Sequence, residues 1–263
     1  MTTLRALIWD VDGTLAETER DGHRIAFNRA FEDEGLPWHW DVARYGELLK
    51  ITGGKERLRH WWHALDPVAA ARPDAQDVVL RLHARKTAHY AELVREGVVV
   101  LRPGVRRLLI EARLRGLQLA IATTTTEANV RELLHATLGE AASGWFTTIG
   151  AGDTVARKKP APDIYRWVLE RMRLRAADCV AVEDSAAGVA AARDAGVPVL
   201  LTRGLYTRGE LAGPVLADLD GLGSHHEAAR GLVGARPWHG LVDVARLREW
   251  HQAAIGTAAA PVV

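Results

Sequence analysis

Residues 4–15 read LRALIWDVDGTL and begin with an apolar run that stops at charged residues. The run over residues 4–9, followed by Asp10, Asp12 and Gly13, predicts a buried strand that ends in a sharp polar turn. Side chains alternate along a strand, so Asp10 and Asp12 point the same way. Two neighbouring carboxylates stay ionised at low cost only beside a cation. The stretch therefore predicts a site for a hard divalent metal such as Mg²⁺, with a solvated acidic turn as the alternative.

The composition is that of a globular protein with a sizeable core. The chain has 263 residues, 48% of them hydrophobic, which suits one domain with an insertion or two small domains. A formal net charge of +1 gives no reason to expect nucleic acid or a membrane as a partner. The single cysteine, Cys179, excludes an intrachain disulfide and fits a reducing compartment. Without a signal-type or membrane-spanning segment, a cytoplasmic monomer is expected.

Residues 16–96 follow helical rather than strand patterns. Apolar residues such as Phe27 and Phe31 recur at helix spacing, and Pro73 can start a long helix that continues to residue 95. An insertion of this length is too long for a simple crossover between strands. We therefore predict an all-helical cap domain over residues 16–96 that leaves the main domain and re-enters it.

From residue 97 the chain alternates between apolar strand signals and helical segments. The expected strands cover residues 117–122, 146–149, 179–182 and 197–201. This order predicts an α/β fold, a Rossmann-like parallel sheet with helices on both faces, formed by residues 1–15 and 97–222. In such sheets ligands bind beyond the carboxyl ends of the strands.

Residues 223–263 form a C-terminal extension that carries no recognisable motif. Leu241, Val244, Leu247 and Trp250 recur at helical spacing. This spacing predicts a last amphipathic helix over residues 240–255.

Polar residues end several of the predicted strands or precede the following helices. They are Asp10, Asp12, Thr123, Lys159, Glu183 and Asp184. Taken singly, Thr123 could be a helix N-cap, Lys159 a surface lysine, and the Glu183-Asp184 pair ordinary capping before a helix. Taken together they indicate phosphoryl transfer, because a transferred phosphoryl group needs compensation for charge spread over three oxygens.

The four signals in this order resemble the motifs of the haloacid dehalogenase superfamily of phosphohydrolases. The motifs are DVDGT at residues 10–14, Thr123, KPAPD at residues 159–163 and VEDS at residues 182–185, and the resemblance covers residues 4–218. It implies a haloacid dehalogenase-like α/β core with an inserted cap, a phosphoric monoester hydrolase activity and Mg²⁺ as the cofactor.

The resemblance and the chemistry assign the same roles to these residues. Asp10 would attack the phosphorus and form an aspartyl-phosphate, while Asp12 would protonate the leaving oxygen and then activate water. Thr123 would hold phosphate oxygens, and Lys159 would offset the charge on Asp10 and on the phosphoryl group. The Mg²⁺ ligands would be Asp10, the Asp12 backbone carbonyl and Asp184, with Glu183 orienting metal-bound water.

The predicted cap would recognise the substrate. Two glycines in the TGGKER segment at residues 52–57 let backbone amides approach an anion, and Lys55 with Arg57 would neutralise it. We therefore predict that the substrate carries a second phosphate, which this segment binds. The alternative is that the segment is a glycine-rich helix start with a solvated basic face. The expected substrate-binding residues are Glu17, His23, Thr52, Gly53, Gly54, Lys55, Arg57 and Thr124.

Four segments resemble the CbbY-type subgroup of the superfamily. They are AETE at residues 16–19, AFN at residues 26–28, TGGKER at residues 52–57 and KKPAPDIY at residues 158–165. The subgroup includes phosphatases that convert xylulose 1,5-bisphosphate, an inhibitor of Rubisco, to xylulose 5-phosphate. The resemblance implies a small phosphorylated sugar as substrate.

Three other functions remain open. A β-phosphoglucomutase-like mutase shares the fold and the acid pair, but TTE occupies residues 125–127, where such mutases usually carry a Lys-Asn or similar pair. A phosphatase for another ester, such as a phosphoglycolate-type substrate, would keep the same chemistry. A non-catalytic binding protein is disfavoured because all four motifs are intact.

Overall fold

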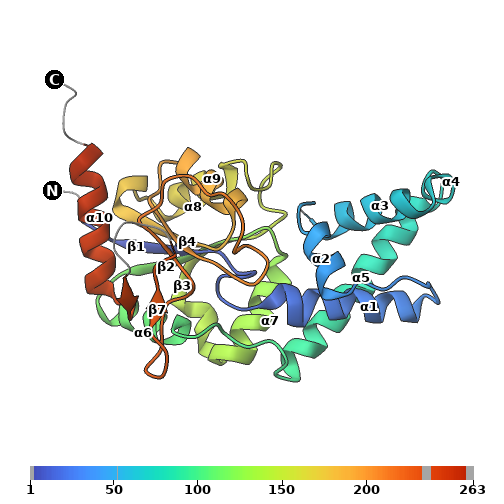
Figure 1. Ribbon diagram of the computed structural model, residues 1–263, viewed down its shortest axis with the longest axis horizontal. Coiled ribbons are helices and arrows are strands. Elements are labelled where there is room, and N and C mark those ends of the chain that lie inside the picture. Colours follow the sequence, from blue (N-terminus) through green and yellow to red (C-terminus); the bar gives the residue numbers. More distant parts are fainter. Residues whose placement is uncertain (1–2, 52, 233–237, 259–263) are drawn as a thin grey trace.

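The core of the protein is a six-stranded parallel sheet (Figure 1). The computed structural model describes residues 3–51, 53–232 and 238–258. In spatial order the strands are β3 (Phe146–Gly150), β2 (Gln118–Ala122), β1 (Ala6–Trp9), β4 (Cys179–Glu183), β5 (Val199–Thr202) and β6 (Ala217–Leu219). The predicted α/β fold class is confirmed, with β6 as an additional edge strand.

Helices cover both faces of the sheet. The first face packs against α6 (Val105–Leu114) and α7 (Glu127–Leu138), and the second against α8 (Asp163–Met172) and α9 (Ala186–Asp194). Alternation along β1 sends Leu7 and Trp9 to the first face and Ala6 and Ile8 to the second. Sheet and helices are thereby held together by apolar burial on both sides of β1.

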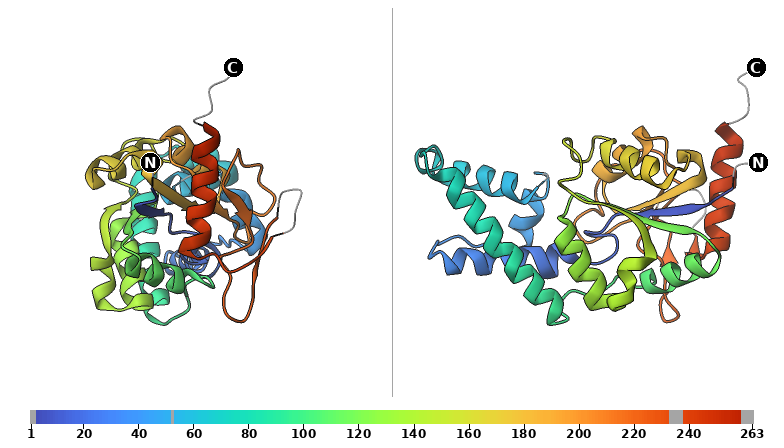
Figure 2. Two further views of the ribbon diagram at one scale, coloured as in Figure 1. Left: turned by 90° about the vertical axis from the view of Figure 1, so that its left-hand side faces the viewer. Right: turned by 180° about the vertical axis from the view of Figure 1, so that it is seen from behind.

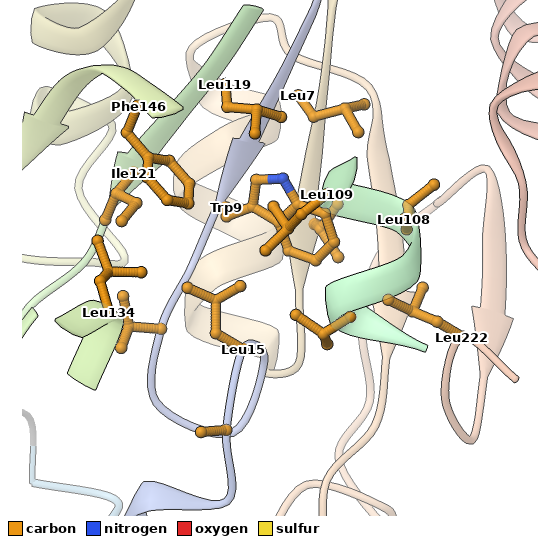
Figure 3. Close-up of a cluster of buried hydrophobic side chains, with 14 of the residues drawn as sticks. Leu7, Trp9, Leu15, Leu108, Leu109, Leu119, Ile121, Leu134, Phe146 and Leu222 are labelled. Carbon is orange, nitrogen blue, oxygen red and sulfur yellow. The ribbon is translucent and has the colours of Figure 1, made fainter. Parts of the chain in front are cut away.

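Trp9 is the largest side chain of the first face and lies at its centre. It is fully buried, and Figure 3 shows its ring between Leu109 of α6, Leu15 and the side chains of β2. Because β1 ends at this residue, the packing of the Trp9 ring fixes the point at which the chain leaves the sheet. Asp10 follows immediately, so its position at the sheet edge is set by the core beneath it.

The inserted segment forms a separate group of helices (Figures 1 and 2). After a π-helical turn (Glu19–His23) come α1 (Arg24–Asp33), α2 (Val42–Leu48), α3 (Gly54–Leu65), α4 (Pro67–Ala70) and α5 (Ala75–Arg95). They enclose their own aromatic core, which includes Phe27, Phe31, Trp40 and Trp62. The predicted domain boundaries at 15/16 and 96/97 stay a prediction. An isolated β-bridge between Ala16 and Leu101 joins the two segments that connect the core with the inserted helices.

The C-terminal part packs at the end of the core opposite the cap (Figure 2). β7 (Ala229–Arg230) and β8 (His239–Gly240) pair antiparallel, and α10 (Val244–Ala258) follows. The predicted helix over residues 240–255 therefore starts too early, because the backbone of residues 239–240 is engaged in a strand. Val244 and Leu247 are fully buried in the first-face core, which accounts for the amphipathic spacing. No helix in the described ranges is long and apolar enough to cross a membrane.

Candidate active site

Three carboxylates meet at the carboxyl ends of β1 and β4. Asp10 follows β1, Glu183 ends β4 and Asp184 comes next; one oxygen of each lies within 4.8 Å of the others. All three side chains are buried. Gly13 makes this arrangement possible, since it has a φ of 84° and a Cβ there would overlap the Asp184 carboxylate. The turn that follows β1 is thus shaped to bring Asp184, the residue after β4, against it.

Lys159 lies between two of these carboxylates. Its Nζ is 2.6 Å from Asp10 Oδ1 and 2.5 Å from Glu183 Oε1. The hydroxyl of Tyr165, in α8, donates to the same Glu183 oxygen. Lys159 is itself buried, so each of these charge-assisted hydrogen bonds acts in a medium of low polarity. The lysine is thereby held beside Asp10.

The cluster carries more negative charge than Lys159 can balance. Burial raises the pKa of Asp10 to about 7, although Lys159 acts in the opposite direction. Burial, followed by repulsion from Asp10 and Glu183, raises the pKa of Asp184 well above its ordinary value. Burial lowers the pKa of Lys159, but the two carboxylates outweigh this and leave it raised. A cation among these oxygens would remove the excess charge.

The second oxygen of Glu183 lies against the start of α9. Within the described ranges, Glu183 Oε2 is buried and has no hydrogen-bond partner. Gly188 of α9 leaves room for it, because a Cβ at this position would overlap the Glu183 carboxylate. An all-oxygen, multiply charged site of this kind fits a hard divalent cation held by Asp10 and Asp184, with Glu183 beside it.

The prediction that Asp12 points the same way as Asp10 is wrong, because β1 ends at Trp9 and strand alternation does not continue into the turn. The Asp12 side chain is directed to residues of the inserted segment instead of the carboxylate cluster. Thr18 Oγ1 donates to Asp12 Oδ1 at 2.5 Å, and His23 Nε2 lies 3.1 Å from the same oxygen. Lys86 Nζ lies 2.9 Å from His23 Nδ1, so the imidazole ring connects Lys86 with Asp12. Burial would raise the pKa of Asp12, but His23 and Thr18 lower it further than burial raises it. In this position Asp12 is ionised and able to accept a proton.

A cavity of about 860 Å³ lies between the core and the cap. Core residues contribute its charged floor, and α2 with the start of α3 contributes the cap side. Of the residues predicted for the site, those that line it are Asp10, Asp12, Glu17, Gly53, Arg57, Thr124, Lys159 and Asp184.

Other predicted residues lie elsewhere in the structure. Thr123 is buried below the cavity, where its hydroxyl accepts from the Thr125 N–H at 3.3 Å. His23 contacts Asp12 rather than the cavity, and Gly54 packs near His83. Lys55 is half-buried at the start of α3 outside the cavity lining. Thr52 lies outside the described residues.

Sequence reasoning missed Lys86, which is tied to Asp12 through His23. The helical periodicity of residues 75–95 could have indicated that Lys86 is buried. Lys86 lies on the same side of the helix as the buried residues Val79, Leu82, Tyr90 and Leu93. A lysine in an apolar stripe is expected to have a specific partner, because burying an unpaired charge is costly.

Residues 4–196 match the haloacid dehalogenase-like hydrolase family. The chain belongs to this family. A CbbY protein of Cupriavidus necator is 48% identical over 249 residues, which covers 94% of this chain and 97% of the relative. A CbbY protein of Rhodobacter capsulatus is 50% identical over 208 residues, 79% of this chain and 88% of that one. The chain is therefore a phosphatase of the CbbY type.

Solved structures of the family have the same architecture. The crystal structure of CbbY from Rhodobacter sphaeroides in complex with phosphate matches with a TM-score of 0.76 and 42% identity. A mutant of that protein in complex with xylulose-(1,5)bisphosphate matches with a TM-score of 0.76 and 41% identity. Each match covers 85% of this chain and 98% of the other.

Proposed function

We propose that this enzyme is a Mg²⁺-dependent phosphatase that converts xylulose 1,5-bisphosphate to xylulose 5-phosphate. The observation that carries the proposal is the position of Asp10, which lies 2.6 Å from Lys159 at the floor of a cavity whose cap side includes Arg57. A cavity with cationic groups on opposite sides suits a sugar with a phosphate at each end. The complex of the Rhodobacter sphaeroides relative with this bisphosphate supports the choice of substrate.

In the proposed reaction Asp10 is the nucleophile. Its carboxylate attacks the phosphorus of the first phosphate and the bond to the sugar oxygen breaks, which leaves an aspartyl-phosphate. Lys159, fixed between Asp10 and Glu183, stabilises the charge on the phosphoryl oxygens. The negative charge of the bound substrate raises the proton affinity of Asp12, so that Asp12 takes up a proton as the substrate binds. It gives this proton to the leaving sugar oxygen, and the resulting carboxylate then takes a proton from the water that hydrolyses the intermediate.

Mg²⁺ is the cation that suits this site best. Asp10, Asp184 and the Asp12 backbone carbonyl would hold it, with Glu183 orienting its water. The donors are all oxygens, and a metal bound through few protein ligands leaves positions for water and phosphate. When bound, the ion would polarise the phosphate and offset the negative charge that the three buried carboxylates accumulate.

The binding of Mg²⁺ should depend on pH because protons compete for the same carboxylates. With the pKa of Asp10 at about 7 and that of Asp184 also raised, we expect the dissociation constant to fall by about tenfold per unit for each proton displaced as the pH rises from 5.5 to 7. Isothermal titration calorimetry of the metal-free enzyme with MgCl₂ measures this directly. An affinity that does not change over this interval would contradict binding at Asp10.

The same raised pKa makes the stability of the metal-free fold depend on pH. Between the ordinary value of 3.8 and about 7, the folded state holds a proton on Asp10 that the unfolded chain has lost. The contribution of Asp10 to the free energy of unfolding of the metal-free enzyme therefore falls as the pH rises through this window. Saturating Mg²⁺ is expected to remove that fall, which urea unfolding with and without the ion would show.

On the cap side, Arg57 is the leading candidate to bind the second phosphate. The residue is buried, and its guanidinium is already oriented by the Leu48 carbonyl at 3.1 Å and by the Tyr45 hydroxyl at 2.9 Å. An arginine fixed in this way loses little further freedom when it binds an anion. Lys55 stays a second candidate, one that would have to turn towards the cavity.

We expect Arg57→Gln to lower kcat/KM for xylulose 1,5-bisphosphate about 10- to 100-fold, the range of a charged hydrogen bond. With acetyl phosphate, which has no second phosphate, the loss should be several-fold smaller. Phosphate release measures both. Arg59→Gln is the matched control, because Arg59 is on the same helix and its guanidinium donates to Gln76 instead of pointing into the cavity lining. Equal losses with both substrates would contradict the assignment, and Lys55→Ala tests the second candidate in the same assay.

The substrate itself is tested with a panel that pairs mono- and bisphosphates of the same sugar. We expect Mg²⁺-dependent phosphate release from xylulose 1,5-bisphosphate to be the most efficient reaction. Turnover of another ester without this one would reject the substrate and keep the class of reaction. Isomerisation of β-glucose 1-phosphate in the presence of a bisphosphate primer would instead favour a phosphomutase.

A further inference from the structure

The loop between β5 and β6 connects the acidic cluster with the cap. Its base is fixed by Arg203, whose Nε and Nη2 each donate to the Asp218 carboxylate at 2.8 Å. Arg203 Nη1 also donates to the carbonyls of Thr207 and Glu210, both at 2.7 Å. Thr207 Oγ1 lies 3.4 Å from Asp184 Oδ2. These bonds therefore fix the position of the loop relative to the Asp184 carboxylate.

Tyr206 is the residue of this loop that meets the cap. Its ring centroid lies 6.2 Å from that of Tyr45 in α2, with the ring planes at 65°. A methyl group on Gly46 would lie only 3.0 Å from Tyr206 Cδ1. The Tyr206 hydroxyl is buried, and no residue in the described ranges forms a hydrogen bond with it. The contact between loop and cap is thus made by the ring.

Gly46 is otherwise unexpected in the interior of α2. Glycine weakens a helix relative to alanine, and Gly46 is not among the glycines with a positive φ. A Cβ here would make a tight contact with the ring of Tyr206, 3.0 Å from Cδ1 and 3.2 Å from Cε1. Close approach of the core loop to the cap therefore accounts for this glycine.

The ring on which Tyr206 packs belongs to the cap side of the cavity. The Tyr45 hydroxyl donates to Glu19 Oε2 at 2.6 Å and accepts from Arg57 Nη1 at 2.9 Å. The guanidinium carbon of Arg57 also lies 5.1 Å from the centroid of the Tyr45 ring. Glu19 and Arg57 both line the cavity. Any shift of the Tyr45 ring would therefore move cavity groups relative to the core.

We propose that Tyr206 is a cap-docking residue, whose ring occupies the space left by Gly46 and sets the position of Tyr45 and Arg57 relative to Asp10. It is a positioning residue, because in this role it acts through Tyr45 and Arg57 and touches no reacting atom. The proposal rests on the proposed function in that it takes Arg57 as the contact for the second phosphate. Tyr206 should then affect substrates that reach the cap more than esters that do not.

The kinetic test uses Tyr206→Ala and Tyr206→Phe with two substrates. We expect Tyr206→Ala to lower kcat/KM for xylulose 1,5-bisphosphate about two- to tenfold, the range of an aromatic pair, mainly through a higher KM. The loss with acetyl phosphate should be smaller, and Tyr206→Phe, which keeps the ring, should stay close to the wild type. Leu211→Ala is the control, since Leu211 is in the same loop and is 96% exposed.

Two kinetic results would overturn the proposal. Equal losses with both substrates would mean that Tyr206 supports the core alone. A loss in Tyr206→Phe as large as in Tyr206→Ala would mean that the hydroxyl, not the ring, is used.

The glycine gives an independent test by a double-mutant cycle. Gly46→Ala should lower kcat/KM for the bisphosphate about two- to fivefold in the wild-type background, because the new methyl group displaces the ring. In the Tyr206→Ala background the same change should cause no further loss. Independent effects of the two substitutions would reject a contact between them.

A distance measurement tests docking without any substrate. Spin labels on Val68→Cys in the cap and Leu114→Cys in the core, 81% and 82% exposed, report the separation of the domains, and the only native thiol, Cys179, is buried. We expect Tyr206→Ala to broaden the distance distribution by pulsed electron spin resonance. An unchanged distribution would overturn the docking role. If the wild-type enzyme does not hydrolyse xylulose 1,5-bisphosphate, the proposed substrate is rejected. The distance measurement still decides the role of Tyr206, because it uses no substrate.

Discussion

Asp10→Asn is expected to lower phosphate release by about 10⁴-fold or more, because the amide cannot attack phosphorus. The fold should survive the change. Burial raises the pKa of Asp10, so the carboxylate is costly to ionise and the neutral amide relieves that cost. A phosphate-release assay, together with thermal unfolding of both proteins, measures the two effects.

Asp12→Asn is the matched control for this experiment. It removes the proposed acid and base but keeps the nucleophile, so with acetyl phosphate, which has a good leaving group, the phosphorylated enzyme should accumulate. Intact-protein mass spectrometry would detect one added phosphoryl group in Asp12→Asn and none in Asp10→Asn. A phosphorylated form of the Asp10→Asn protein would show that another residue is the nucleophile.

Lys159→Met is expected to reduce both activity and stability. The substitution leaves Asp10 and Glu183 buried without their cation, and removing one partner of a buried pair costs about 3 to 5 kcal/mol of the free energy of unfolding. We expect kcat to fall about 10²-fold or more, because the positive charge beside the phosphoryl oxygens is lost. Urea unfolding of the metal-free proteins gives the change in stability.

The pH dependence separates this explanation from a simple packing defect. Without Lys159 the pKa of Asp10 should rise further, so the variant should recover stability as the pH is lowered from 8 to 5. Lys50→Met is the control for stability, since the ion pair of Lys50 with Glu47 is exposed, and its effect should be within about 0.5 kcal/mol. A Lys159→Met protein with an equal deficit at pH 5 and pH 8 would contradict the electrostatic account.

Local sequence was sufficient for the main features of the core. The apolar run before Asp10 predicts a strand because burial of both faces leaves few polar residues in it, and β1 is indeed buried throughout. The order of strands and helices predicts a parallel sheet, and parallel strands present their carboxyl ends at one edge. For that reason Asp10 and Asp184 could be expected to meet, and their oxygens do lie together.

Short and irregular elements could not be predicted in the same way. β6, β7 and β8 have three residues or fewer, which is too short for any periodicity to appear. The predicted helix over residues 240–255 starts too early for the same reason, since the spacing of Leu241 and Val244 does not reveal that residues 239–240 pair with β7.

The cap side of the site depends on contacts between residues far apart in the chain. His23 contacts Lys86 because two helical segments of the cap pack against each other. Tyr206 contacts Gly46 because a loop of the core packs against the cap. Spacing along one element says nothing about such pairs. The sequence thus determined the sheet and the chemistry at its edge. Tertiary packing alone decided which way Asp12 faces and which residues form the cap side of the cavity. The physical reason is that strand and helix patterns record burial within an element, while the mutual orientation of two domains depends on how their surfaces fit.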